Sequence, residues 1–499
     1  MLFNSYLFVF VFLPVLLTGY YMIAYLERKP SKAAVLMKLW LTGMSLWFYA
    51  SFGLQFLSLF LGSCGYEYLI FFLMQKADRR NAKSLRSALF AAGIIGNLAL
   101  LLYFKYAGFF GDILSMVTGA DFSFGNVLLP LAISFYTFQQ ISFLADAWKG
   151  EIRECSLIDY AVYITFFPKI LQGPIVRFDE MKTQFDHMPA MRLKSESFYR
   201  ALLLFTMGLA KKVLLADTLG KAADYGYTNL TILTQPDAVI VAVSYALQLY
   251  FDFSGYCDMA QGVCRMMGLE LPLNFNMPYQ ARNIMDFWKR WHITLTRFFT
   301  RYVYIPLGGS REGTFRLYRN IFLIFLLSGF WHGAGWTFII WGLMHGILYM
   351  VTRMLQRKNV KPLPGRAGHV AGVLLTDLYV TAAWIFFRAE SAADALQMYR
   401  NILQKPVLQI TPDLADCFHL DEIWYVLKVT PVAQWKYSGD ICMWTVLAVA
   451  AGLSLFGKRA DRAAGDCSMK CRWAFLAGIL FVWSVLTFSN VSTFLYLNF

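Results

Sequence analysis

Residues 328–346 read SGFWHGAGWTFIIWGLMHG, an apolar segment that carries two of the six histidines of the chain. An ionisable side chain at membrane depth is costly and is therefore a candidate for function. Glycines surround His332, which predicts a bent or closely approached backbone at this residue. We favour a functional role for His332, whereas His345 better fits a hydrogen-bonded packing role. On one helix the two would differ by about 220° and about 20 Å, so they cannot share a metal ion.

A second candidate segment is ARNIMDFWKRWHITLTRFFTRYVYIPLGG, residues 281–309. Helical periodicity places its basic residues on one face and its aromatic residues on the other, which predicts an amphipathic helix at the cytoplasmic membrane face. His292 falls at the edge of the apolar face, where a satisfied interfacial histidine is the simplest interpretation. The basic face could bind lipid head groups or the phosphates of an anionic donor. Its members are Arg282, Lys289, Arg290, Arg297 and Arg301.

The segment LQLYFDFSGYCDMAQG, residues 247–262, places two carboxylates in an apolar run. Buried carboxylates need partners, so Asp252 and Asp258 should face the interior of a helical bundle with arginines or histidines nearby. A structural hydrogen-bond network is a slightly better interpretation of the pair than a catalytic role. Asp252 is kept as a candidate for substrate or donor binding.

The elements that position these residues must be membrane helices. The 499-residue chain is 58% hydrophobic and 15% charged, whereas soluble proteins carry about a quarter charged residues. Its apolar runs approach or exceed the roughly 18-residue length of a membrane span. We predict an all-α polytopic membrane protein with roughly ten to twelve transmembrane or re-entrant helices. The segments are 2–26, two passes within 33–74, 88–104, 128–147, 157–176, 201–215, 238–251, 321–355, 370–387, 443–456 and 473–488.

Basic loops set the predicted orientation. Residues 27–32 follow the first apolar run, which has no basic residue before it and so is not a signal peptide. The positive-inside rule places this flank and the loops 76–86, 353–366 and 458–472 in the cytoplasm, with the N-terminus outside. The net charge of +14 is then mainly a topology and lipid-contact signature. The less apolar stretch 389–440 should lie outside, as short helices at the membrane surface.

One apolar segment, FFPKILQGPIVRF at 166–178, is interrupted by Pro168, Gly173 and Pro174. Non-helical backbone at membrane depth is tolerated where it is buried in protein or lines a cavity. The interruption indicates either a re-entrant loop beside an internal tunnel or a kinked packing helix, and the sequence favours neither.

Several function classes find no support. The sequence has no P-loop, GxGxxG or GxSxG motif, which argues against most ATP-driven pumps and serine hydrolases. It has no HExxH motif and no Cys/His cluster, so no metal site is predicted. The eight cysteines imply no disulfide framework, and no basic-aromatic module indicates nucleic acid.

The motifs together resemble the membrane-bound O-acyltransferase (MBOAT) family, in its alginate O-acetyltransferase-like branch. They occur in order along the whole chain. They are MLFNSYLFVFVFLP at the start, LLYFKYAGFF at 101–110, LPLAISFYTFQQISFLAD at 129–146, FFPKILQGPIVRF, FDFSGYCDMAQG at 251–262, FWKRWHITLTRFFTRYVYIPLGGSR at 287–311, WHGAGWTFIIWGLMHG at 331–346 and FLYLNF at 494–499. Ala132 stands where the pattern has glycine, which touches nothing catalytic. The D-alanyl transferase of teichoic acid synthesis looks like a more distant relative.

The resemblance implies a single transmembrane domain over 1–499 that transfers acyl groups through a tunnel. It maps the family's invariant histidine onto His332, as general base, and a second catalytic position onto His292. Lys289, Arg290, Arg297 and Trp331 are then candidates for donor binding. A covalent route through Ser328 is weaker, because Gly329 leaves the local helix uncertain.

The implied function is transfer of acetyl from a cytoplasmic donor, acetyl-CoA or an acyl carrier thioester, across the bacterial inner membrane. No bound cofactor is expected. An extracytoplasmic acetyltransferase of the SGNH type would be the partner, and a polysaccharide would be the acceptor. One alternative is a proton-coupled transporter that uses His332, Asp252 and Asp258 as a relay, although we find no inverted repeat. Another is a non-catalytic scaffold for a secreted enzyme.

Overall fold

A computed structural model describes residues 1–122, 128–188, 194–360, 363–405, 409–431, 435, 437–467, 471–490 and 493–495. These residues form helices and connecting segments, with no β-strand in the described ranges. Parts of four predicted segments lie outside the description, namely 361–362 and 468–470 of two basic loops, 406–408, 432–434 and 436 of the stretch 389–440, and 496–499 of the terminal motif.

Eight of the described helices are long and apolar enough to cross a membrane. A shorter apolar helix, Trp473–Leu486, and interrupted apolar segments add to them. The predicted all-α polytopic fold is confirmed, and the protein is a multi-pass membrane protein. The spans are Phe8–Leu26, Pro30–Ala50, Leu54–Arg79, Lys83–Thr118, Gln235–Met266, Trp336–Arg357, Gly365–Arg388 and Ser438–Phe456.

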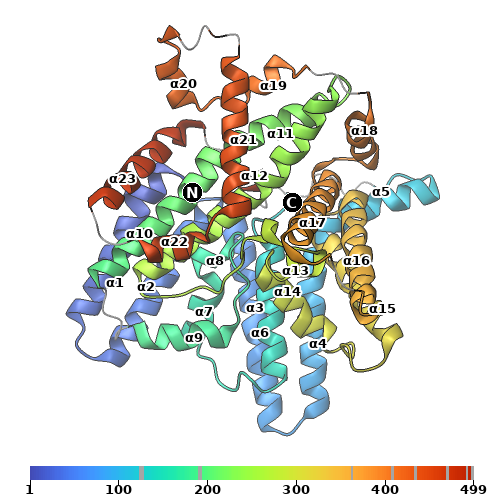
Figure 1. The fold of residues 1–499 in the computed structure, drawn as a ribbon. Helices are drawn as coiled ribbons and strands as arrows, with labels where there is room; N and C mark the ends of the chain where they lie inside the picture. The colour runs from blue at the N-terminus through green and yellow to red at the C-terminus, as the bar shows by residue number, and fades with distance from the viewer. Residues whose placement is uncertain are drawn as a thin grey trace. The chain divides into compact units, whose positions relative to one another are not determined.

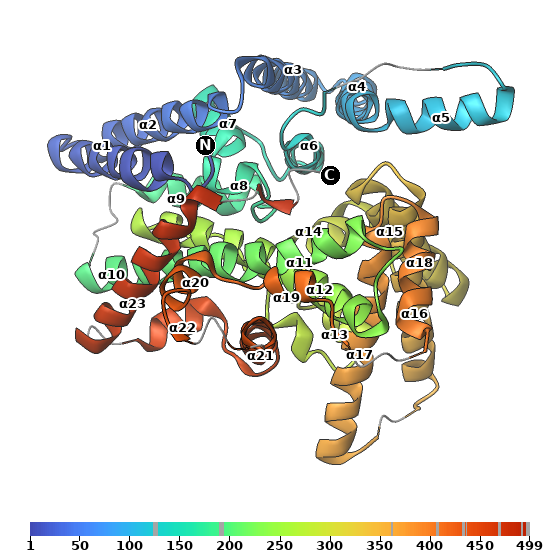
Figure 2. The same cartoon turned by 90° about the horizontal axis from the view of Figure 1, so that it is seen from above.

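The chain divides into two compact units. Unit 1 contains Met1–Leu202 and Ala260–Pro272, and unit 2 contains Leu203–Met259 and Leu273–Phe499. In unit 1 the first four α-helices follow one another in a row, seen from above in Figure 2. The helices of unit 1 are η1 (Phe8–Phe12), α1 (Leu13–Leu26), α2 (Pro30–Ala50), α3 (Leu54–Arg79), α4 (Lys83–Leu101), η2 (Leu102–Tyr106), α5 (Ala107–Thr118), α6 (Ile133–Trp148), α7 (Leu157–Thr165), α8 (Phe167–Ile170) and α9 (Phe178–His187).

Unit 2 carries the histidine segments, and α10 (Ser195–Ala210) and α12 (Gln235–Met266) run across the boundary between the units. Its other helices are η4 (Lys211–Ala216), α11 (Asp217–Thr228), η5 (Pro278–Gln280), α13 (Ile284–Trp288), α14 (Ile293–Phe299), η6 (Thr300–Tyr304), α15 (Thr314–His332), α16 (Trp336–Arg357), α17 (Gly365–Arg388), α18 (Ala392–Leu403), α19 (Pro412–Asp416), α20 (Asp421–Leu427), α21 (Ser438–Phe456), α22 (Ala460–Asp466), α23 (Cys471–Leu486) and η8 (Thr487–Asn490).

Two glycines let α15 and α16 pack backbone against backbone, and the two helices lie side by side in Figures 1 and 2. A Cβ atom added at Gly329 would lie 2.5 Å from the carbonyl oxygen of Phe338. One added at Gly342 would lie 2.5 Å from the carbonyl oxygen of Phe325. Small residues at a crossing allow membrane helices this close approach. The crossing fixes the end of α15, where His332 lies.

The predicted single amphipathic helix over 281–309 is wrong. The segment is divided into α13, a turn, α14 and the π-helical η6. Bonds to a preceding strand-like segment cause the break, because the N–H of Asn276 donates to the carbonyl of Arg290 and that of Ile293 donates to the carbonyl of Asn274. The Asn274 side chain also accepts from the N–H of Thr294 at 3.2 Å. The basic residues of the segment therefore do not share one helical face.

The interruption predicted at 166–178 is confirmed. The chain forms the short helix α8 and then non-helical backbone before α9 begins at Phe178. This backbone is buried in unit 1, as membrane-depth backbone without helical bonds must be unless it lines a cavity.

Short helices were predicted between 389 and 440. The structure has three of them there, α18, α19 and α20. The cysteines whose side chains are described are free thiols.

Candidate active site

His332 is the last residue of α15, directly before an extended segment that leads to α16. This confirms the backbone break predicted at this residue. Only 3% of its surface is exposed, and its Nδ1 lies 2.6 Å from the carbonyl oxygen of Ser328. Because a carbonyl oxygen only accepts, Nδ1 carries the proton, and in the neutral ring Nε2 keeps its lone pair. The backbone thus presents a base whose tautomer is fixed.

Aromatic rings enclose the His332 imidazole. The ring centroids of Trp331 and Trp341 each lie 4.8 Å away, and that of Phe387 lies 5.4 Å away. All three rings meet the imidazole edge to face, so the ring is held on several sides by packing.

His292 lies in the turn between α13 and α14, with a φ of +43°. This left-handed conformation is uncommon for a residue with a Cβ, and it is found at sites where the surrounding structure imposes it. The side chain is buried against the ring of Phe253 at 4.8 Å. Burial, and then the proximity of His332, hold the pKa of His292 well below its usual range. The imidazole is neutral and can donate one N–H.

Trp331 connects the two histidines. Its ring centroid lies 4.8 Å from that of His332 and 6.2 Å from that of His292. Residues that are forty positions apart in sequence therefore share one buried aromatic neighbour. Trp331 was a candidate for donor binding, and the structure places it between the two candidate catalytic residues. We call His292, Trp331 and His332 the histidine cluster.

His345 lies on α16 and is fully buried. The indole N–H of Trp288 donates to its Nδ1 at 3.3 Å, and its ring stacks on that of Phe287. The ring of Trp341 lies 5.1 Å from it and also contacts His332. These contacts fit the packing role that the sequence indicated for His345, behind the histidine cluster.

A cavity of about 340 Å³ lies next to Ser328, and none of the three residues of the histidine cluster is among its lining residues. Ser328, whose carbonyl holds His332, contributes to one part of its wall. Lys289 and Arg353 also line it, together with apolar and tyrosine side chains such as Phe325 and Tyr349. The cavity can take a narrow, largely apolar group that carries negative charge at one end.

The other basic residues predicted to bind the donor do not line this cavity. Arg290 is held by Asp286, with an Nε to Oδ1 distance of 2.9 Å. Arg297 lies on α14, and the guanidinium of Arg301 lies 5.7 Å from the ring of Tyr302. Of the candidates on this segment, Lys289 is the cation that lines the cavity.

Asp252 is buried, as predicted, but its partner is a lysine. Its carboxylate lies 2.8 Å from Nζ of Lys212 and accepts from the N–H of Leu495 at 3.1 Å. Asp258 pairs with Lys211 at 2.6 Å. The expectation of arginine or histidine partners was wrong. The described contacts of Asp252 are with Lys212 and Leu495, and its neighbour Phe253 contacts His292.

Sequence reasoning missed the residues that enclose the site. Trp288, Trp341 and Phe387 come from three different helices, and their apolar side chains carry no signal beyond ordinary membrane-helix composition. Arg353 was assigned only to a basic loop. A search for cations one to two turns inside a span end would have selected it.

Comparison with known proteins finds a family and several relatives. Residues 149–386, which include the whole histidine cluster, match the profile of the membrane-bound O-acyltransferase family. A peptidoglycan O-acetyltransferase of Helicobacter pylori is 39% identical over 431 residues, covering 81% of this chain and 80% of the relative. The protein named probable alginate O-acetylase in Pseudomonas aeruginosa is 39% identical over 416 residues, covering 82% and 76%. A teichoic acid D-alanyltransferase of Bacillus subtilis is 29% identical over 249 residues, covering 47% and 62%.

Proposed function

The chain belongs to the membrane-bound O-acyltransferase family and is an O-acyltransferase, and from this premise we propose its donor, its reaction and its route. The protein takes an acetyl group from a cytoplasmic thioester and passes it across the membrane for O-acetylation of an exopolysaccharide or a cell-wall glycan. The relatives are named for acyl transfer to alginate, peptidoglycan and teichoic acid, which supports a polymer as the final acceptor. The observation that carries the proposal is the histidine cluster together with its link, through the Ser328 carbonyl, to a cavity that Lys289 and Arg353 also line.

The donor is acetyl-CoA or an acetylated carrier protein. Both present the thioester on a thin pantetheine arm that ends in phosphate. The apolar wall of the cavity suits the arm, while Lys289 and Arg353 suit the phosphate. In this arrangement the acetyl end of the arm points toward Ser328 and the histidine cluster.

His332 acts as general base. Its Nε2 takes the proton of the acceptor hydroxyl as the hydroxyl oxygen attacks the thioester carbonyl carbon. When the tetrahedral intermediate collapses, the C–S bond breaks and the thiolate leaves with the acetyl group now in an ester. The proton held on Nε2 passes to the thiolate, which restores the neutral histidine. The bond from Nδ1 to Ser328 keeps the ring oriented throughout.

His292 stabilises charge. A neutral imidazole can donate one N–H to the oxyanion that forms on the carbonyl oxygen, in a site from which the aromatic rings exclude water. Its low pKa favours this role, because it stays a hydrogen-bond donor without competing for the hydroxyl proton. Trp331 holds the two imidazoles at a fixed spacing.

Delivery to the polymer requires a partner. The protein acts in the bacterial inner membrane, and an SGNH-type acetyltransferase outside it completes the transfer to the polysaccharide. The predicted topology places the short helices between 389 and 440 on the side of the membrane where such a partner would act.

The test uses the purified chain in phospholipid nanodiscs with radiolabelled acetyl-CoA, or with an acetylated carrier protein. Thioester consumption that depends on His332 and on an added hydroxyl acceptor supports the proposal. Glycan acetylation in cells that persists with His332→Ala would leave only the scaffold interpretation. Solute transport without thioester consumption would favour a transporter.

A further inference from the structure

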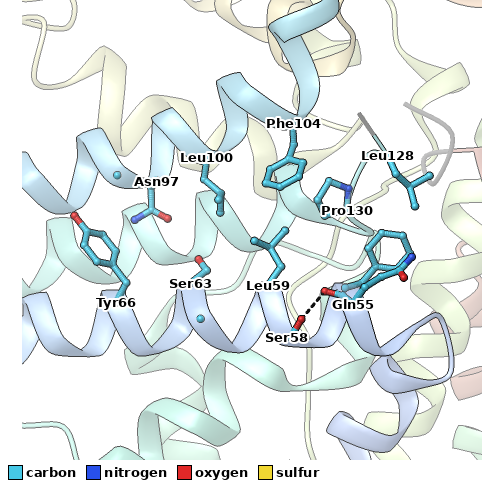
Figure 3. A pocket seen from close by; sticks show the side chains of 13 residues that line it. Gln55, Ser58, Leu59, Ser63, Tyr66, Asn97, Leu100, Phe104, Leu128 and Pro130 are labelled. Atoms are coloured by element: carbon cyan, nitrogen blue, oxygen red, sulfur yellow. Dashed lines mark hydrogen bonds between the residues drawn. The ribbon is translucent and has the colours of Figure 1, made fainter. Parts of the chain in front are cut away.

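Unit 1 contains a groove between two membrane helices that the acyl-transfer site does not use. Its walls come from α3, from α4 with the start of η2, and from residues 128–130, and its volume is about 1020 Å³ (Figure 3). Ligand cavities in proteins are commonly about 300–1,000 Å³, so the space is at the upper end of this range. Its lining is mainly apolar, with Phe56, Leu59, Leu100, Phe104 and Leu128 among the contributors.

The groove lies between two helices that are candidates to cross the membrane. Both wall helices lie in candidate membrane spans, Leu54–Arg79 and Lys83–Thr118. Their outer faces carry exposed apolar side chains, among them Leu69 on α3 and Ile95 on α4. An occupant must therefore come from the hydrocarbon region that surrounds the helices.

Three polar side chains of the groove have hydrogen-bond partners within the protein. Asn97 donates to the carboxylate of Glu67 at 2.7 Å, and Ser63 donates to the side-chain oxygen of Gln140 at 3.0 Å. Ser58 donates to the carbonyl of Gln55 at 2.9 Å, the dashed contact in Figure 3. These three groups would all keep their hydrogen-bond partners if an apolar molecule occupied the groove.

One end of the groove is closed. Tyr66 crosses from α3 to α4, where its hydroxyl donates to the carbonyl of Ala92 at 2.8 Å. Its ring lies over Gly96, where an added Cβ would be 2.6 Å from the ring. In Figure 3 Tyr66 stands at one end of the row of lining residues and Gln55 at the other. The two are eleven residues apart on α3, or about 17 Å along the helix.

This length selects the occupant. The hydrocarbon core of a bilayer is about 30 Å thick, so one leaflet contributes about 15 Å, close to the length of the groove. A transmembrane helix, from a partner or from a second copy of the chain, would need the full thickness and about 20 residues. Tyr66 would stop such a helix halfway, whereas a hydrocarbon chain that ends at the bilayer midplane fits.

We propose that this groove binds one acyl chain of a phospholipid from the extracytoplasmic leaflet. The chain lies along α3, with its methyl end at Tyr66 and its ester end at Gln55. The orientation follows from the basic loop 76–86 after α3, which the positive-inside rule places in the cytoplasm and which puts Gln55 at the opposite surface. Gln55 is exposed at the open end, where it meets the glycerol backbone and head group.

A pair of glycines on α3 gives a matched test. Gly62 lines the groove, and an added Cβ there meets no atom within 4 Å, so Gly62→Leu should place its side chain in the groove. Gly65 is on the same helix and is equally open, but it does not line the groove, so Gly65→Leu is the control. Leucine is the better helix former at both positions, so both variants are expected to fold.

The experiment reconstitutes the full chain in phosphatidylethanolamine vesicles that contain a small fraction of phosphatidylethanolamine with a diazirine on one acyl chain. After irradiation, mass spectrometry maps the adducts. In the wild type they should concentrate on the groove walls, at Leu59, Leu100 and Phe104, above the level at the outward-facing Leu69. Because a leucine at 62 occupies the path of the chain, Gly62→Leu should lower the groove adducts about tenfold, and Gly65→Leu should keep them.

Two further readouts fix the occupant and the leaflet. A diazirine near the ester should mark the Gln55 end, and one near the methyl terminus should mark the Tyr66 end. The reverse order would overturn the assignment to the extracytoplasmic leaflet. Equal adducts in the two glycine variants would mean ordinary annular lipid and would overturn the site. Cross-linking gives another test. If cysteines introduced at 59 and 100 cross-link to a second copy of the chain or to a partner helix, the groove holds a helix and the lipid proposal is overturned.

Discussion

Nδ1 of His332 lies 2.6 Å from the main-chain carbonyl oxygen of Ser328, one helical turn earlier on α15. This bond decides which ring nitrogen is available for chemistry, because the proton must lie on Nδ1. It also ties the base to the backbone at the point where the helix ends. The backbone of α15 therefore helps to set the orientation of the His332 ring.

His332→Ala should abolish acetyl transfer while the protein still inserts and folds. Loss of a general base costs about 10²–10⁴-fold in rate, and alanine leaves no other side-chain base at this position. The measurement is glycan-bound acetate in a knockout strain that expresses each variant at matched membrane abundance. Acetylation at the wild-type level would contradict the catalytic assignment.

Two other histidines serve as comparisons for that experiment. His369 lies on α17, away from the histidine cluster, so His369→Ala should retain activity. His345→Ala should be milder than His332→Ala, because it removes the acceptor of the Trp288 N–H and leaves a packing defect. Equal inactivation by all three substitutions would indicate a general loss of folding.

His292→Asn separates backbone conformation from chemistry. Asparagine tolerates the left-handed conformation that His292 adopts at φ +43°, so the turn between α13 and α14 should be kept. The imidazole donor is lost, and kcat should fall about 10²–10³-fold with KM nearly unchanged. Steady-state kinetics with the purified variant give this measurement. A rise in KM with unchanged kcat would instead assign His292 to donor binding.

Acid should destabilise the fold through His292. Its pKa is well below the usual range, so below about pH 6.5 the unfolded chain binds a proton that the folded chain does not. The free energy of unfolding therefore falls as the pH drops from about 6.5 toward the folded-state pKa, by at most about 1.4 kcal/mol per pH unit. Thermal unfolding of the wild type and of His292→Asn in detergent, followed between about pH 7.5 and 5.5, should show the smaller acid shift in the variant. Parallel pH profiles would rule out this contribution.

The cavity cations should set the donor's KM. Lys289→Gln and Arg353→Gln should each raise it about two- to fivefold, as expected for loss of one partly exposed charge contact. The wild-type KM should also rise with salt. Arg316→Gln is the matched control, because Arg316 pairs with Glu312 on the surface. Equal KM values in all variants would leave these cations a topological or lipid-contact role.

The predicted topology can be tested by cysteine labelling. In a cysteine-free background, single cysteines within 76–86, 282–319 and 353–366 should resist an impermeant reagent added to intact cells. A cysteine at Glu390, in the stretch predicted outside, should react. Labelling within any of the three basic segments would overturn the orientation.

Composition and apolar run length were sufficient to predict the helical membrane fold, because a bilayer leaves few alternatives. The break at His332 was also predictable, since the glycines that follow it cannot be explained by packing periodicity alone. The partners of Asp252 were not, because Lys212 lies on another helix and nothing local distinguishes lysine from arginine or histidine.

The 281–309 segment shows where periodicity fails. Its basic and aromatic residues are spaced as on the two faces of an amphipathic helix, yet Asn274 and Asn276 bond to the turn and divide it. These bonds connect residues some 14 to 20 positions apart. A helical wheel of residues 281–309 cannot show them, because Asn274 and Asn276 lie outside that segment. The left-handed residue that results is His292, so the deviation from the sequence pattern falls on a candidate catalytic residue.

The bond from the N–H of Leu495 to Asp252 spans 243 residues of sequence. At a synthesis rate of about 5–20 residues per second, the ribosome needs roughly 12 to 50 s to make the donor after the acceptor. Lys212 precedes Asp252 in the chain, so the ion pair can form during that time, whereas the bond from Leu495 cannot. The hydrogen bonds of Asp252 can therefore be completed only after the C-terminal residues have been synthesised.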